Sequence, residues 1–190
     1  MYEAKNFERL LGTEGFSDVL LRNHFTLYEG YVSNTNKVSE LLKTAETGTP
    51  LYNEVKRRFG WEWNGMRLHE LYFGNMIKGG TPLETKTALA KKIVEDFGSF
   101  EAWEKDFRAT GAMRGIGWAV LARDGESGRL FNVWVNEHDG GNLAGATILL
   151  VMDVFEHAFA LDYGIKRADY INAFWAAIDW VVVSHRFAGK

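Results

Sequence analysis

The sequence predicts an α+β fold: a helical amino-terminal hairpin, then a small three-stranded antiparallel sheet with flanking helices. Three observations support this. Apolar residues recur at helical spacing as far as Arg114. Beyond Arg114 the chain contains runs of β-branched and aliphatic residues that are typical of strands. Finally, 46% of the 190 residues are hydrophobic, which is enough to bury a sizeable core.

The first two helices are expected to fold back on each other. Residues 17–45 show helical periodicity, and either Ser17 or Asp18 can cap the start of this helix. A TGTP segment separates it from a second helical region at 51–77. Gly60 and Gly65 within that region indicate either close packing or a local interruption.

The second half is expected to contain both helices and the sheet, with a domain boundary near residue 80 that gives domains 1–80 and 81–190. The expected elements, in chain order, are two helices within 81–114 split at Gly98, strands at 117–124 and 129–137 joined by GESG, a third strand at 146–153, and one closing helix at 167–188.

Charge and cysteine content exclude several classes of protein. A formal net charge of −3 argues against nucleic acid as the main partner, and the absence of cysteine excludes disulfides and thiolate metal sites. The amino terminus lacks a basic region followed by an apolar run, and the longest apolar run is too short to cross a bilayer. We therefore expect no membrane association and a cytoplasmic location.

Histidines and one aspartate suggest a metal site. His24 and His69 lie within the two antiparallel helices, while Asp153 ends the third strand and His157 follows four residues later. Three imidazoles and a carboxylate suit iron, manganese or zinc. Each residue alone also has a plainer interpretation. A single histidine on a helix is more often a core residue, and Asp153 can cap a helix that begins at residue 154.

The segment DVFEHAFALDYGIKRADYINAFW, which begins at Asp153, resembles the carboxy-terminal signature of the iron/manganese superoxide dismutases. The resemblance extends along essentially the whole chain: His24 is followed by YVSNTN, His69 lies in LHELYF, and Gly117 and Trp118 begin a strand. It implies a superoxide dismutase whose metal lies at the interface of the two domains. The implied ligands of one iron or manganese ion per subunit are His24, His69, Asp153 and His157.

The chain departs from the family pattern at several positions. Phe155 replaces the usual tryptophan, Ala160 replaces a tyrosine that reaches across the dimer interface, and Tyr28 replaces the histidine that partners it. Tyr28 is therefore a candidate to fill the space opened at Ala160 of a second copy. The family's active-site tyrosine corresponds to Tyr31 if the first helix lacks one residue, which would leave that helix regular. Either tyrosine can share the face of His24, and both can instead be core residues.

The surroundings of the metal distinguish the iron and manganese types. Iron-type members have a glutamine four residues before the second ligand, where this chain has Gly65. Manganese-type members supply that glutamine from a loop that corresponds to NEHDGGN, which contains His138. We expect His138 to replace the amide that hydrogen-bonds metal-bound solvent, although it can also be an exposed loop residue. The expected catalytic residues are Tyr31, His138 and Tyr28, and iron is expected ahead of manganese.

The resemblance also implies an oligomer. In the family, the glutamate beside the last ligand reaches that ligand in a second copy, and the chain retains this pair as Glu156 and His157. We therefore expect a homodimer or homotetramer with Glu156 at the interface, acting on superoxide. The alternative is a metal-binding scaffold of the same fold with lost or altered redox activity.

Overall fold

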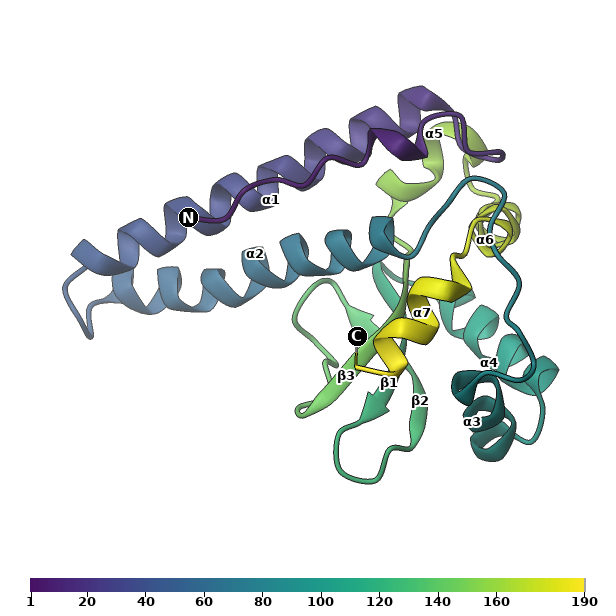
Figure 1. Cartoon of the computed structure of the whole chain (residues 1–190). Coiled ribbons are helices and arrows are strands. Elements are labelled where there is room, and N and C mark those ends of the chain that lie inside the picture. Colours follow the sequence, from purple (N-terminus) through teal and green to yellow (C-terminus); the bar gives the residue numbers. More distant parts are fainter. Residues whose placement is uncertain (190) are drawn as a thin grey trace.

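The computed structural model describes residues 1–189 and has the predicted α+β architecture (Figure 1). A long antiparallel pair of helices lies beside a three-stranded sheet, and shorter helices surround the sheet. The elements are η1 (Glu8–Leu10), α1 (Asp18–Thr44), α2 (Pro50–Gly74), α3 (Ala88–Phe97), α4 (Phe100–Ala112), β1 (Gly117–Asp124), β2 (Leu130–Asn136), β3 (Ala146–Asp153), η2 (Glu156–Ala158), α5 (Ala160–Tyr163), α6 (Arg167–Ala176) and α7 (Trp180–Phe187).

Side-chain caps define where the two long helices begin. The Ser17 hydroxyl accepts a hydrogen bond from the backbone N–H of Leu20 at 3.0 Å, so Ser17 rather than Asp18 is the N-cap of α1. Thr49 caps α2, whose first residue is Pro50. Both Gly60 and Gly65 lie inside a continuous α2, so the interpretation of either glycine as an interruption is wrong.

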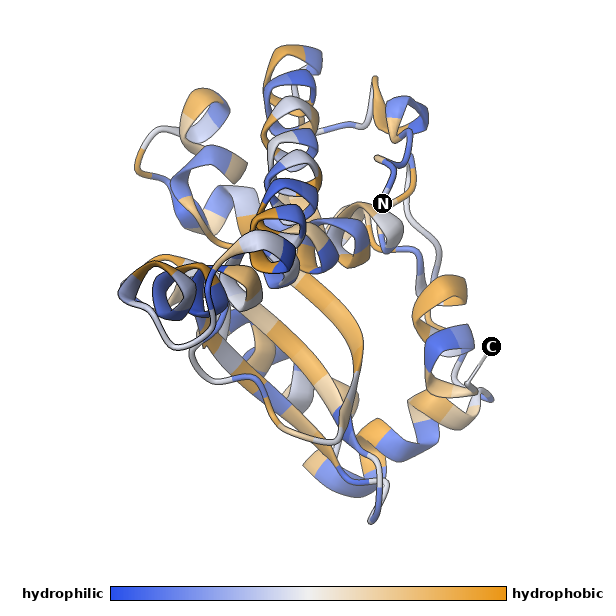
Figure 2. Ribbon diagram, turned by 90° about the vertical axis from the view of Figure 1, so that its left-hand side faces the viewer, coloured by the Kyte–Doolittle hydropathy of each residue, from blue (hydrophilic) through white to orange (hydrophobic). Residues whose placement is uncertain are grey.

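The sheet has the strand order β2-β1-β3 and is antiparallel throughout. Its strands consist largely of hydrophobic residues (Figure 2). α4 packs against β1 and β2, whereas α2 and α7 pack against β3. With helices against all three strands, the middle of the sheet is buried, as in the first six residues of β1. None of the helices within residues 1–189 has the length and apolarity needed to cross a bilayer.

The prediction of one closing helix at 167–188 is wrong, because the structure has two helices, α6 and α7, separated at 177–179. In the break, the Ala177 carbonyl accepts from the N–H of Ile77 at 2.8 Å, and the N–H of Asp179 donates to the Asn75 carbonyl at 2.9 Å. The Asp179 side chain then caps α7. These backbone groups pair with the segment after α2, so they cannot continue a helix.

Asn75 joins the end of α2 to β3, which is an edge strand. Its side-chain Oδ1 accepts from the N–H of Val151 at 2.9 Å, and its Nδ2 donates to the Val151 carbonyl at 3.2 Å. Arg186 from α7 adds hydrogen bonds to the Leu149 and Leu71 carbonyls. Side chains therefore provide the hydrogen-bond partners for backbone groups on the open edge of β3. The same contacts fix the position of α2 relative to β3.

Replacing Asn75 with leucine should lower the free energy of unfolding by about 2–3 kcal/mol, because it leaves buried backbone groups of Val151 without partners. Urea unfolding measures this change. Asn53→Leu, at an exposed position of α2, is the matched control and should change the free energy of unfolding by less than about 0.5 kcal/mol. Equal stability of the Asn75 variant and the wild type would contradict this account of the edge.

Candidate metal centre

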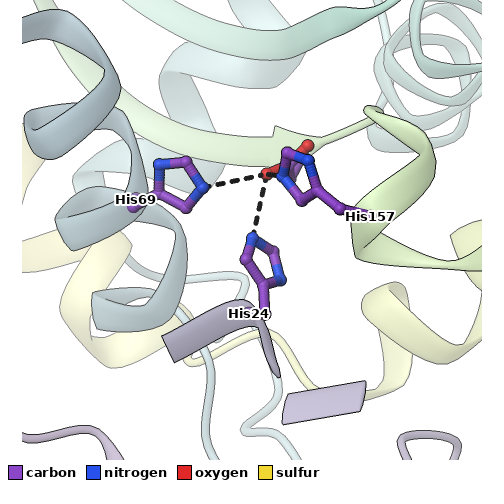
Figure 3. Close-up of side chains that lie close together, drawn as sticks. His24, His69 and His157 are labelled. Carbon is purple, nitrogen blue, oxygen red and sulfur yellow. Dashed lines mark hydrogen bonds and ion pairs between the residues drawn. The ribbon is translucent and has the colours of Figure 1, made fainter. Parts of the chain in front are cut away.

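Four side chains from four separate elements converge beside the sheet (Figure 3). His24 comes from α1, His69 from α2, Asp153 from the last residue of β3, and His157 from η2. One potential ligand atom from each residue lies within 4.8 Å of all the others. The structure thus brings together all four residues that the sequence singled out as ligands.

A single carboxylate oxygen lies at the centre of this cluster. Oδ2 of Asp153 is 3.2 Å from Nε2 of His24, 3.1 Å from Nε2 of His157 and 3.7 Å from Nε2 of His69. The other oxygen, Oδ1, accepts a hydrogen bond from the N–H of Phe155 at 2.9 Å and so fixes the orientation of the carboxylate. Asp153 therefore caps the turn after β3 with one oxygen and faces the imidazoles with the other.

The hydrogen bonding of His69 favours a bound cation. Its Nδ1 donates to the Gly65 carbonyl at 2.6 Å, which leaves Nε2 as an unprotonated nitrogen that faces the cluster. This Nε2 atom is buried and has no hydrogen-bond partner. Because an unpartnered buried polar atom costs free energy, the site fits a metal ion that Nε2 can bind. Three imidazole nitrogens and one carboxylate oxygen suit iron or manganese.

The protonation states also suit a metal. Burial lowers the pKa of both His24 and His69, so these imidazoles are neutral near pH 7, as metal ligands must be. Burial opposes ionisation of Asp153, but its contacts with the His157 and His24 imidazoles outweigh burial and hold the pKa of the carboxyl well below its usual range. The cluster therefore offers two neutral imidazoles, from His24 and His69, and one anionic donor, from Asp153.

Aromatic rings enclose the four ligands. Trp118 contacts His69 edge-on at a centroid distance of 4.9 Å. Phe155, which stands where the family usually has tryptophan, stacks on His157 at 5.1 Å and on His138 at 4.9 Å. Phe155 therefore lies between a ligand and the neighbouring imidazole. An enclosure of this kind excludes water and strengthens the electrostatic interactions inside it.

His138 is fully buried, so its interpretation as an exposed loop residue is wrong. Its Nδ1 accepts a hydrogen bond from the indole N–H of Trp118 at 3.1 Å, and its Nε2 lies 2.8 Å from the hydroxyl of Tyr31. Because an indole can only donate, Nδ1 must be the acceptor, and in the neutral ring the proton lies on Nε2 and is donated to Tyr31. Burial lowers the pKa of His138 to about 4, which keeps the ring neutral at physiological pH.

Tyr31 reaches His138 by lying across a glycine. Its ring stacks on His69 at 5.1 Å, and a Cβ atom at Gly65 would lie 2.6 Å from its Cδ1 atom. No larger residue fits at position 65 while Tyr31 keeps this place. α1 is a regular α-helix throughout, as expected if one residue is missing before Tyr31.

Tyr28 has different contacts and does not join the hydrogen bonds of His138. Its hydroxyl donates to Oε1 of Glu70 at 3.1 Å and accepts from the N–H of Lys5 at 3.0 Å. Burial raises its pKa to about 12. The side chain has no exposed surface in the single chain, so the hypothesis that Tyr28 fills space at Ala160 of a second copy is wrong.

Two residues near His138 were not expected from the sequence. Trp61 lies with its ring centroid 4.5 Å from that of His138, and its indole N–H donates to the Glu137 carboxylate at 3.1 Å. The spacing of Trp61, Gly65 and His69, four residues apart each time, places them along one side of a helix. This spacing is a signal from which Trp61 could have been found.

Comparisons with known proteins show the family of the chain. Residues 85–186 match the family model described as iron/manganese superoxide dismutases, C-terminal domain. The chain is 38% identical to an iron superoxide dismutase of Aquifex pyrophilus, over 97% of this chain and 90% of that protein. It is 39% identical to an iron superoxide dismutase of Aquifex aeolicus, over 92% and 85% of the two chains. It is also 39% identical to a manganese superoxide dismutase of Haloferax volcanii, over 85% and 81%. The chain belongs to the iron/manganese superoxide dismutase family.

Proposed function

We propose that this protein disproportionates superoxide at one iron or manganese ion per chain, held by His24, His69, Asp153 and His157. The observation that supports this most directly is the convergence of three imidazoles on one buried carboxylate, with all four donors within 4.8 Å of one another. Iron is the more expected ion, because relatives such as the two Aquifex proteins are iron enzymes, while the Haloferax relative carries the manganese name. The intact ligand set supports an enzyme over an inactive scaffold.

When bound, iron or manganese would supply a couple of trivalent and divalent states, with which one superoxide can be oxidised to dioxygen and a second reduced, with two protons, to hydrogen peroxide. The protein holds the imidazoles of His24 and His69 neutral by burial. Asp153 contributes one negative charge, and its backbone carbonyl accepts a hydrogen bond from Tyr170. The Asp153 carboxylate would lower the net charge of a bound ion, and the hydrogen bond from Tyr170 helps to fix the backbone that carries it.

Tyr31 and His138 are suited to supplying protons. The Nε2–H of His138 is directed to the Tyr31 oxygen, which leaves the phenol hydrogen free to be donated elsewhere. Burial raises the pKa of Tyr31, so its phenol remains protonated at neutral pH. Tyr31 therefore takes the part of the active-site tyrosine in this proposal. Tyr28 has no part in the relay, because its hydroxyl is occupied by Glu70.

A homodimer or homotetramer fits the surroundings of Glu156. This carboxylate is exposed beside His157, whose side chain is 27% exposed, and within residues 1–189 it makes no hydrogen bond or ion pair. A second copy related by a two-fold axis would give both groups a partner. We also propose that domains 1–80 and 81–190 meet at the metal, since two ligands come from each. A cytoplasmic location stays a prediction.

Removing the metal should abolish superoxide consumption, and restoring iron or manganese should recover it. Zinc is the control, because it binds similar donors without redox chemistry and should not restore activity. Activity is measured by the disappearance of superoxide on protein of known metal content. Activity in the metal-free or zinc-loaded protein would contradict the proposal, whereas full iron or manganese loading without activity would establish the scaffold.

His138→Gln should lower the reduction potential of the iron-loaded protein and raise the ratio of manganese to iron activity. A glutamine amide is less bulky than an imidazole and could approach metal-bound solvent more closely, and a stronger hydrogen bond to that solvent would favour its hydroxide form and hence the oxidised metal. Redox titration and activity of both metal forms measure these effects. His185→Gln, at an exposed histidine, is the matched control. If wild type and His138→Gln have the same reduction potential and the same ratio of manganese to iron activity, His138 does not influence the metal.

Glu156→Ala should weaken self-association, which light scattering at micromolar concentration detects. The expected result is a dimer or tetramer for the wild type and a larger monomer fraction for the variant, because the proposed contact is lost twice across the two-fold axis. Glu126→Ala, at an exposed position of the β1–β2 turn, serves as the control. A fully active wild-type monomer would refute the proposed interface.

A further inference from the structure

Glu137 has an unusual backbone conformation directly before His138. Its φ is 48°, and among residues 1–189 it is the one residue other than glycine with a positive φ. This conformation is unfavourable for residues with a Cβ atom, so surrounding contacts must maintain it. The conformation turns the chain at the end of β2, and it leaves Glu137 and Asp139 exposed while His138 is fully buried.

Two sets of contacts hold this turn. Backbone hydrogen bonds form the first set: Asn136 and Gly140 exchange bonds within the loop, and the N–H of Glu137 donates to the carbonyl of Ile116, just before β1, at 3.1 Å. From outside the loop, the indole N–H of Trp61 donates to Oε2 of Glu137 at 3.1 Å. This last contact ties the turn to α2, the helix that carries His69.

Trp61 also covers the two residues that the turn brings together. Its ring centroid lies 4.5 Å from that of His138 and 5.6 Å from that of Tyr31. The guanidinium of Arg58 lies 4.0 Å from the indole centroid, and Arg58 pairs with the buried Glu62 at 2.7 Å. The indole is thus in contact with a cation and with the His138–Tyr31 pair, and it has little freedom to move.

We propose that Trp61 and Glu137 are positioning residues that hold His138 in the orientation from which its Nε2–H meets Tyr31. Neither residue needs to touch the metal. Trp61 limits rotation of the imidazole by packing, and its hydrogen bond to Glu137 keeps the loop in the turn that directs His138 inward. The expected change in reduction potential rests on the proposed function, because it requires a redox metal at the site; the orientation of His138 does not.

The test combines redox titration of the iron-loaded protein with crystal structures of the variants. Trp61→Phe keeps an aromatic ring and deletes the N–H. Its reduction potential should rise by 59 mV or more, which is a tenfold change in the ratio of oxidised to reduced iron. In the crystal, the distance from Nε2 of His138 to the Tyr31 hydroxyl should exceed 3.5 Å. Glu137→Ala should behave in the same way, and the double variant should shift no further, since both changes remove one hydrogen bond.

Two controls separate positioning from general damage. Glu137→Gln keeps an oxygen that can accept from Trp61 and should stay within twofold of the wild-type redox ratio. Trp63→Phe, on the same helix, is matched to Trp61→Phe. Trp63 also donates an indole N–H hydrogen bond, to the Tyr2 hydroxyl, and its ring also faces a guanidinium, that of Arg67. Its replacement should leave the redox ratio unchanged.

Specific results would overturn the inference. These are an unchanged potential and an unchanged His138–Tyr31 distance in Trp61→Phe, or a Glu137→Gln variant that shifts as far as Glu137→Ala. Should Trp61→Phe fail to fold, Glu137→Ala alone decides, because the Glu137 side chain is exposed. Neither readout requires turnover of superoxide, so an inactive wild type would refute the proposed function while these measurements still test the inference.

Discussion

Asp153 places a carboxylate where no water reaches it, and the surrounding structure is arranged to compensate that buried charge. An isolated buried anion is costly. The imidazoles of His24 and His157 lie within hydrogen-bond distance of its Oδ2, and a metal ion held by all three imidazoles would supply the compensating positive charge. α1, α2 and η2 supply these imidazoles, and β3 supplies the carboxylate. Any shift between the helical hairpin and the sheet would separate the charge from its partners. The cluster therefore constrains how the helical hairpin lies relative to the sheet.

Asn75 and Arg186 maintain that placement. Both bind backbone groups of β3, and Arg186 also binds the end of α2 through the Leu71 carbonyl. Burial lowers the pKa of Arg186 to about 10, which still leaves it charged at neutral pH. Hydrogen bonds from a charged donor are stronger than those between neutral groups, so this link is suited to holding the two parts of the site together.

Large aromatic side chains fill the space around the candidate metal site, and one glycine, Gly65, leaves space for one of them. Tyr31 occupies the space where a side chain at position 65 would lie, so α2 cannot supply a polar group there. The polar group next to Tyr31 comes instead from the loop after β2, as His138. These features depend on one another: the absent Cβ at Gly65 admits the phenol ring, and the phenol hydroxyl gives the buried imidazole its partner.

The fold class, the two long helices and the three strands could be predicted from sequence alone, and His24, His69, Asp153 and His157 could be singled out as candidates for a metal site. The elements follow from local periodicity and capping residues, whereas the resemblance to the iron/manganese superoxide dismutases implied that His24, His69, Asp153 and His157 are ligands. Helical spacing could have placed Trp61 on the side of α2 that carries His69, but its contact with His138 could not be predicted. Nor could the break between α6 and α7, because both depend on contacts between residues far apart in the chain. Helical periodicity continues through 177–179, but pairing of those backbone groups with the segment after α2 interrupts the helix. Similarly, Tyr28 and Tyr31 lie on similar faces of one helix, and only tertiary packing decided that Tyr28 meets Glu70 while Tyr31 meets His138.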